Sequence, residues 1–130
     1  MDIQRAVYQQ IVRQAYAEAP LECCGYLAGT GGEVLKAYPM ENTDKSAIHY
    51  TFRPEEQFRT IKDMRQKGLK VLAVYHSHPE SPARASAEDI KLAYDSNVSY
   101  VIISLQDVEE VVKSFRIKDG QVQEEELKIQ

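Results

Sequence analysis

Two histidines one residue apart, and an aspartate eleven residues after them, are the side chains of this sequence best suited to binding a metal. His76 and His78 follow the apolar run 71–74, which predicts a strand arriving from the interior. Side chains at positions i and i+2 of a strand point to the same face, so we expect the two imidazoles to lie side by side. Asp89 comes three residues after Ser86, where a helix is expected to begin. Two imidazoles and a carboxylate suit an open zinc site, which keeps a fourth position for water.

Each half of this pattern also has an ordinary structural explanation. A His-x-His pair at a strand end is often simply solvated, and Ser-x-x-Asp is a common N-terminal capping pattern of helices. The two halves together, at this spacing, favour the metal site.

The helices that must position these side chains follow from apolar periodicity. The first is an amphipathic helix with apolar residues at four-residue intervals, namely Ile3, Val7, Ile11 and Ala15. The second begins at Pro54, and its expected buried stripe is Phe58, Ile61 and Met64 or Arg65. Its C-cap is expected at Gly68. The third is capped by Ser86 and contains Ile90, Leu92, Ala93 and Tyr94.

Strands are expected between and after these helices. Their predicted ranges are 24–27, 34–38, 48–52, 70–75, 100–105, 111–117 and 122–129. Residues 29–32 and 119–120 are glycine-containing turns between consecutive strands. The continuous apolar run 100–105 predicts a central strand that is buried on both faces. The order of elements predicts an α/β fold in which one mixed sheet is flanked by helices.

Length and composition predict a single soluble domain spanning residues 1–130. With 16 basic and 20 acidic residues, the net charge of −4 gives no sign of a nucleic-acid surface. No apolar run approaches the ~20 residues that span a bilayer, and the first residues lack a signal-peptide pattern. The adjacent Cys23 and Cys24 cannot link distant segments, which favours a reducing, cytoplasmic setting and a role as small buried side chains.

The pattern His-x-His-Pro, six residues, Ser, two residues, Asp resembles the signature of the JAMM (MPN+) metalloproteases. It is present without a gap as His76, His78, Pro79, Ser86 and Asp89. The family also has a glutamate before a Cys-Gly-aliphatic stretch, matched here by Glu22 in Leu-Glu-Cys-Cys-Gly-Tyr-Leu. The resemblance extends to Asn42 and to the Ser-Tyr-Val-Ile-Ile-Ser segment at 99–104. One departure is Ala85, where many members have proline; it removes no catalytic group.

The resemblance implies a three-layer, cytidine-deaminase-like (MPN/JAMM) fold and a zinc peptidase. It implies zinc binding by His76, His78 and Asp89, with Glu22 as general base. Ser86 would donate a hydrogen bond to the oxyanion, cap the helix, or do both. The compact layout resembles the stand-alone bacterial and archaeal members. The run His-Ser-His-Pro-x-x-Pro-Ala-Arg-x-Ser, with the segment at 99–104, looks most like the bacterial members linked to ubiquitin-like sulfur-carrier proteins. The expected reaction is hydrolysis of the amide bond after the carrier's C-terminal Gly-Gly, which releases cysteine or a short tail.

Three other functions compete with this one. One is a deubiquitinase-like isopeptidase that acts on ubiquitin-like conjugates. Another is a non-catalytic binding scaffold of the same fold, against which the intact set of residues argues. The third is a zinc deaminase, which is disfavoured because Pro-Cys-x-x-Cys is absent. The remaining histidine, His49, is interpreted as a solvated or hydrogen-bonded bystander, with a contribution to the substrate groove as the alternative.

Overall fold

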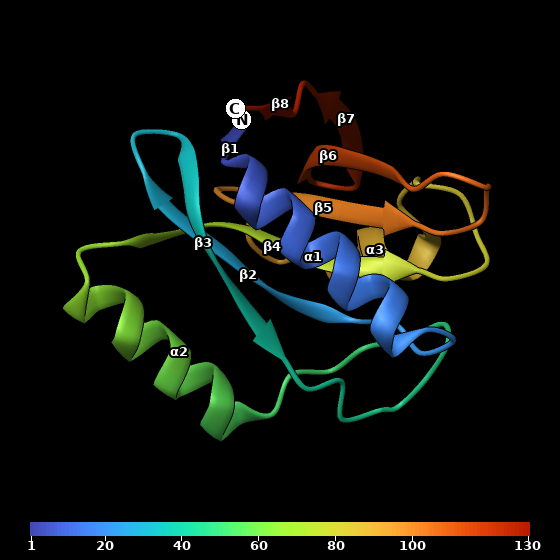
Figure 1. Ribbon diagram of the computed structural model, residues 1–130, viewed down its shortest axis with the longest axis horizontal. Coiled ribbons are helices and arrows are strands. Elements are labelled where there is room, and N and C mark those ends of the chain that lie inside the picture. The colour runs from blue at the N-terminus through green and yellow to red at the C-terminus, as the bar shows by residue number, and fades with distance from the viewer.

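An eight-stranded mixed sheet forms the centre of the protein in the computed structural model, which describes residues 1–130 (Figure 1). The strands are β1 (Asp2–Ile3), β2 (Cys24–Thr30), β3 (Glu33–Met40), β4 (Lys70–His78), β5 (Ser99–Ser104), β6 (Val111–Lys118), β7 (Gln121–Glu125) and β8 (Lys128–Ile129). The helices are α1 (Arg5–Glu18), α2 (Pro54–Gln66) and α3 (Ala87–Lys91). None of the three helices is both long and apolar enough to cross a membrane.

The strands are ordered β7-β6-β5-β4-β2-β3-β1-β8, so the strand that carries both histidines lies at the middle of the sheet. β4 runs parallel to β5 and antiparallel to β2, and His76 is paired with Cys24 on β2 and with Ile102 on β5. Every residue of β5 is buried, which confirms the predicted central strand. The register explains why the segment just before β2, which includes Glu22, reaches the end of the sheet where the histidines lie.

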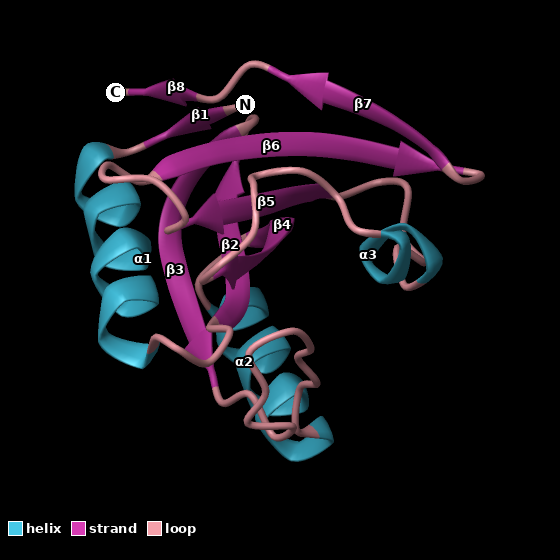
Figure 2. Ribbon diagram, turned by 90° about the vertical axis from the view of Figure 1, so that its right-hand side faces the viewer, coloured by secondary structure: helices cyan, strands magenta, loops and turns pink.

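The curved sheet is covered on both faces, and alternation along β4 separates the two sides. Ala73 and Tyr75 of β4 pack in one apolar cluster with Val7, Ile11 and Ala15 of α1. Val74 contacts the clusters on the opposite face, where α2 and α3 lie. Figure 2 shows α1 on one side of the strands and α2 and α3 on the other. The predicted class, a mixed sheet flanked by helices in three layers, is confirmed.

The strand predicted at 48–52 is wrong, because this segment has no regular secondary structure. Its backbone is bound by neighbouring side chains instead of by another strand. Ser46 Oγ accepts hydrogen bonds from the N–H groups of Ile48 and His49, and Asn42 Oδ1 accepts one from Thr51 N–H. The apolar–polar alternation arises for a different reason, since Tyr50 and Phe52 pack against the α2 side of the sheet while Ile48 is 72% exposed.

The third helix is shorter than predicted. α3 ends at Lys91, so Leu92, Ala93 and Tyr94 lie beyond it. The chain must turn here to enter β5, and the turn is held by Tyr100, whose hydroxyl donates to Asp95 O and accepts from Asp95 N–H.

Smaller differences concern the ends of the chain and α2. Ile3 belongs to β1 rather than to α1, and the last predicted strand is divided into β7 and β8, the second of which pairs with β1. In α2, Met64 is buried as predicted, but Phe58 is 72% exposed, so the buried stripe is narrower than expected. The predicted turns at 29–32 and 119–120 are confirmed, with positive φ angles at Gly31, Gly32, Asp119 and Gly120.

Candidate metal centre

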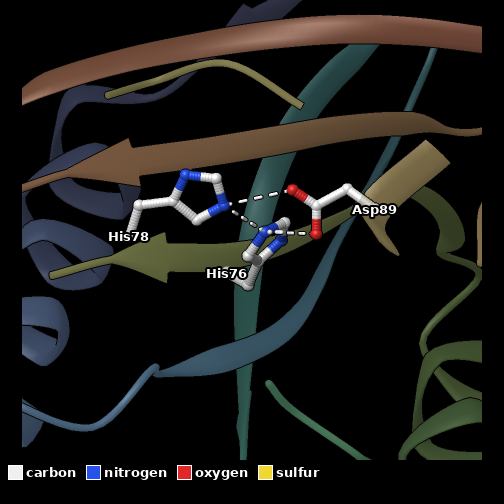
Figure 3. A group of neighbouring side chains, drawn as sticks. All are labelled: His76, His78 and Asp89. Atoms are coloured by element: carbon white, nitrogen blue, oxygen red, sulfur yellow. Dashed lines mark hydrogen bonds and ion pairs between the residues drawn. The ribbon is translucent and has the colours of Figure 1, made fainter. Parts of the chain in front are cut away.

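The structure brings His76, His78 and Asp89 together, with one potential ligand atom from each lying within 4.8 Å of the others. Each carboxylate oxygen of Asp89 faces one imidazole: Oδ1 lies 3.1 Å from His76 Nε2, and Oδ2 lies 3.1 Å from His78 Nε2 (Figure 3). The two Nε2 atoms are also 3.1 Å apart. Both imidazoles are almost fully buried, so water cannot screen these groups from one another.

The position of the proton on the His78 ring indicates that a cation belongs between the three side chains. His78 Nδ1 lies 2.9 Å from the carbonyl oxygen of Pro82, which can only accept, so Nδ1 carries a proton. In the neutral ring, His78 Nε2 therefore presents a lone pair to His76 Nε2 and to the Asp89 carboxylate. One dication would satisfy all three groups. The set of two nitrogens and one oxygen fits zinc and leaves a coordination position open.

Without a metal, the His78 imidazole binds a proton more readily than usual, whereas the Asp89 carboxylate binds one less readily. Burial alone would lower the pKa of His78, but hydrogen bonds to Asp89 and to the Pro82 carbonyl outweigh it and raise that pKa. Burial likewise opposes ionisation of Asp89, yet hydrogen bonds from His76 and His78 hold the pKa of its carboxyl far below the ordinary range. Asp89 is therefore anionic at neutral pH, as a metal-binding carboxylate must be.

A capping box at the start of α3 fixes the orientation of Asp89. Ser86 Oγ accepts from Asp89 N–H at 3.0 Å, and Ser86 N–H donates to Asp89 Oδ2 at 2.9 Å. The predicted cap is thus present. The serine oxygen uses only its accepting capacity in this contact, so its hydroxyl hydrogen stays free to donate to a bound group.

Glu22 lies next to the cluster and is buried, with 5% of its surface exposed. It lines the same pocket as His76 and Asp89. Burial raises the pKa of Glu22 to about 8, with further increases from the charges of Asp89 and Glu88 and an opposing effect of His78. A carboxyl group that exchanges its proton near neutral pH is suited to general acid–base chemistry.

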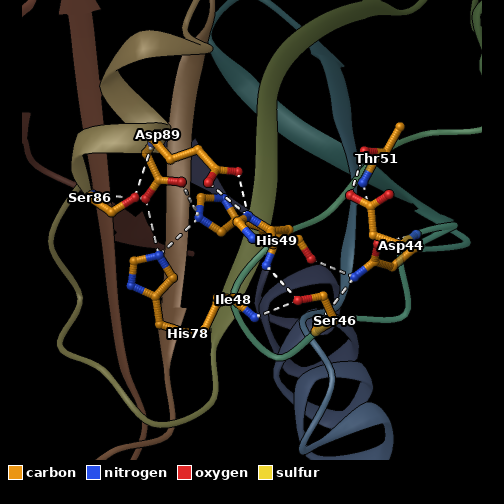
Figure 4. Close-up of polar contacts among 11 residues, drawn as sticks. Asp44, Ser46, Ile48, His49, Thr51, His78, Ser86 and Asp89 are labelled. Carbon is orange, nitrogen blue, oxygen red and sulfur yellow. Dashed lines mark hydrogen bonds and ion pairs between the residues drawn. The ribbon is translucent and has the colours of Figure 1, made fainter.

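Two aromatic rings complete the surroundings of His76. Tyr50 stacks on the His76 imidazole, with ring centroids 4.8 Å apart and an interplanar angle of 26°. His49 lies at the rim of the pocket and pairs with Glu88 of α3 through Nδ1 at 2.7 Å (Figure 4). His49 is therefore hydrogen-bonded, as one interpretation expected, and it also lines the pocket.

Sequence reasoning missed three residues of this environment: Tyr50, Glu88 and, as a contact of Glu22, Asn42. No spacing rule links Tyr50 to His76, which lies 26 positions later in the chain. Glu88 precedes the predicted ligand Asp89, but that position alone carries no chemical signal. Cys23 and Cys24 are free and fully buried, as predicted, and neither belongs to the metal cluster.

Comparison with known proteins agrees with this geometry. Residues 4–118 match the family model described as prokaryotic homologs of the JAB domain. The chain is 33% identical over 122 residues to the CysO-cysteine peptidase of Mycobacterium tuberculosis, covering 92% of this chain and 84% of that protein. It is also 33% identical over 120 residues to a probable TtuB-protein conjugate cleaving protease of Thermus thermophilus, covering 92% and 77%.

Solved structures support the same assignment. A solution structure of a protein from Desulfitobacterium hafniense is 40% identical and has a TM-score of 0.90, with coverage of 100% of this chain and 93% of that one. A JAB1/MPN domain protein from Archaeoglobus fulgidus, at 22% identity, shares the fold with a TM-score of 0.70 and coverage of 99% and 98%. The chain therefore belongs to the family of prokaryotic homologues of the JAB domain, and it is a peptidase of the JAMM type.

Proposed function

We propose that this protein is a zinc-dependent peptidase that cleaves the amide bond after the C-terminal Gly-Gly of a ubiquitin-like sulfur-carrier protein. The product would be the carrier with a free Gly-Gly end, together with cysteine or a short tail. The convergence of His76, His78 and Asp89 beside the buried Glu22 is the observation that carries the proposal. The names of the relatives, a CysO-cysteine peptidase and a TtuB-protein conjugate cleaving protease, support this choice of substrate.

His76, His78 and Asp89 would hold the zinc. When bound, zinc acts as a Lewis acid, which lowers the pKa of a coordinated water from ~15.7 towards ~7. Glu22 would accept the proton of the attacking water and then deliver it to the leaving amine. A positioned carboxylate that takes up a proton in one step can return it in the next.

Ser86 would stabilise the negative charge that develops on the scissile carbonyl oxygen. Its Oγ accepts from Asp89 N–H, so the hydroxyl hydrogen can be donated to that oxygen without breaking the helix cap. A single donor of this kind contributes ~3 kcal/mol to lowering the barrier. The two roles considered for Ser86, cap and oxyanion donor, are compatible in this geometry.

The shape of the surroundings favours a narrow, extended substrate. The metal pocket is bordered by apolar side chains, and Tyr50, Leu92 and Tyr100 also line a neighbouring groove with mainly apolar walls. Two glycines can pass close to the ligands where larger residues would collide with them. The apolar groove would receive the residues that precede the Gly-Gly end.

A second candidate is an isopeptidase that removes a ubiquitin-like protein from a conjugate. The Thermus thermophilus relative, named as a conjugate cleaving protease, favours it. So does the Haloferax volcanii desampylase, which is 33% identical over 93 residues. The chemistry at the metal would be the same, and only the amine side of the scissile bond would differ.

The two free, buried cysteines support a reducing compartment, so we propose that the protein is cytoplasmic.

Mass spectrometry of candidate reactions tests the proposal and separates the two candidates. The zinc-loaded protein is incubated with a carrier–cysteine adduct, with a carrier extended by a short peptide, and with a carrier joined to a lysine side chain. We expect cleavage after Gly-Gly in the first two substrates and none when the penultimate glycine is replaced by valine. Cleavage of the lysine conjugate alone would establish the isopeptidase instead, and equal rates with glycine and valine would contradict the sulfur-carrier proposal.

A further inference from the structure

Asn42 is a buried polar side chain outside the catalytic set, and it is bonded to the segment that carries Glu22. Its Nδ2 group donates to Glu22 O at 3.1 Å and to His49 O at 2.8 Å, with a longer contact to Ser46 O at 3.5 Å. Its Oδ1 accepts from Asp44 N–H at 3.1 Å and from Thr51 N–H at 3.3 Å. One amide therefore serves both the chain at Glu22 and the irregular loop 43–51.

The loop that Asn42 organises also contacts Glu22 directly. Glu22 N–H donates to Ser46 O at 2.8 Å, so both backbone polar groups of Glu22 are bound, one by the loop and one by Asn42 itself. The loop has no strand pairing of its own. The side chains of Asn42 and Ser46 bind its N–H and C=O groups. Further bonds within the loop join Thr51 to Thr43 and Asp44.

The same loop supplies the ring that orients His76. His76 Nδ1 is buried and makes no hydrogen bond, whereas a metal-binding histidine ordinarily has its second nitrogen held by an acceptor. Asp89 faces the Nε2 side of the His76 ring, and the stacked Tyr50 orients its plane. Tyr50 is held between two residues bonded to Asn42, His49 through its carbonyl and Thr51 through its N–H. Asn42 is thereby connected to the proposed general base and to a metal ligand.

We propose that Asn42 is a positioning residue of the peptidase, which fixes Glu22 and the His76 ring relative to each other through loop 43–51. The proposal rests on the proposed role of Glu22. It predicts that loss of Asn42 affects turnover much more than substrate binding, because Asn42 itself lines neither the metal pocket nor the adjoining groove. A small displacement of catalytic groups costs about 10- to 100-fold in rate.

The test compares Asn42→Ala and Asn42→Asp with Asp44→Ala. Asn42→Asp keeps the size and the accepting oxygen but removes the amide donor. Asp44→Ala is the matched control, because it removes the 2.6 Å bond from Thr51 Oγ1 in the same loop and leaves the contacts of Asn42 with Glu22 intact. We expect both Asn42 variants to retain zinc and to lose about 10- to 100-fold in kcat, with KM changed less than about threefold. Asp44→Ala should stay within about threefold of the unchanged protein in kcat.

A second measurement does not depend on activity. In the metal-free protein, the stacked Tyr50 ring should shift the His76 ring protons upfield in the NMR spectrum, and Asn42→Ala should remove this shift while Asp44→Ala preserves it. If the protein without substitutions shows no peptidase activity, the proposed function is refuted, but the NMR measurement still tests the positioning of His76. If neither the His76 proton shifts nor kcat changes in the Asn42 variants, the positioning role is overturned. Loss of the fold in both Asn42 variants would also overturn it, because Asn42 would then be a residue of general stability.

Discussion

Ser77 and Cys23 are joined by two hydrogen bonds that connect the chain of the proposed base to the chain of the metal ligands. Ser77 N–H donates to Cys23 O at 3.0 Å, and Cys23 N–H donates to Ser77 Oγ at 2.7 Å. Ser77 lies between His76 and His78, and Cys23 directly follows Glu22. The alternation of β4 turns the Ser77 side chain away from the metal, so this residue can hold the two segments together without occupying the site.

Replacing Ser77 by alanine should destabilise the protein, because the buried N–H of Cys23 loses its acceptor. Leaving a buried donor unpaired costs ~1–3 kcal/mol in the free energy of unfolding, which denaturant titration measures. Thr43→Ala is a suitable control, since it removes an exposed side-chain bond to Thr51 O at 3.0 Å and should change stability by less than about 0.5 kcal/mol. Equal effects of the two substitutions would show that the Ser77–Cys23 contact stabilises the fold no more than an exposed side-chain bond does.

The protein should bind one zinc ion per chain through His76, His78 and Asp89. Elemental analysis of the double variant His76→Ala, His78→Ala should show no bound metal, because one carboxylate alone is a weak ligand for zinc. Cys24→Ser should retain the metal, since Cys24 is buried on β2 and its Sγ contacts Met40 O rather than the cluster. Full metal retention in the histidine double variant would mean that the ligands lie elsewhere.

The sequence predicted the centre of the fold and the grouping of His76, His78 and Asp89, because both depend on local patterns. His76 and His78 share a face by the two-residue period of a strand, and Asp89 is fixed by a capping box that is visible as Ser-x-x-Asp. The central position of β4 and β5 follows from their apolar composition. These features are set by neighbours in sequence, so one sequence is enough to find them.

The wall of the pocket could not be predicted in the same way. Residues 48–52 alternate like a strand, yet the side chains of Asn42 and Ser46 bind their backbone and hold them as an irregular loop. Tyr50 reaches His76 only because this loop folds over the end of β4. A side-chain amide that replaces strand pairing leaves no periodic signal, so the positions of Tyr50 and His49 required the structure.

The stability of the metal-free protein should depend on pH through Glu22. Burial raises the pKa of Glu22 to about 8 in the folded protein, above its ordinary value of 4.5. A group whose pKa is raised by folding contributes stability that is fully present below pH 4.5 and is lost as the pH rises through about 8. Glu22→Gln stays neutral and avoids this loss. In the presence of a chelator, the free energy of unfolding should therefore fall with pH in the protein with Glu22 but not in the variant. The difference between the two should grow by on the order of 2 kcal/mol from pH 5 to pH 8.5, in favour of the variant. Denaturant unfolding of both proteins across this range measures the difference. Parallel pH profiles would show that Glu22 ionises as freely in the fold as in the unfolded chain.

Glu22→Gln should also separate proton transfer from metal binding. Glutamine keeps the size of the side chain, but it cannot accept a proton at neutral pH. Glu22 is not among the three grouped ligands, so the variant should keep its zinc and its fold. Loss of a general base costs ~10²–10⁴-fold in rate, and kcat should fall by at least this factor while the carrier tail still binds.

Single-turnover assays with a carrier–cysteine adduct, together with titration of uncleaved carrier, measure the two effects. Glu88→Gln, which alters another carboxylate of the same pocket, should cost much less. If Glu22→Gln loses zinc, Glu22 is a ligand; if it retains near-normal turnover, the proton is taken by another group.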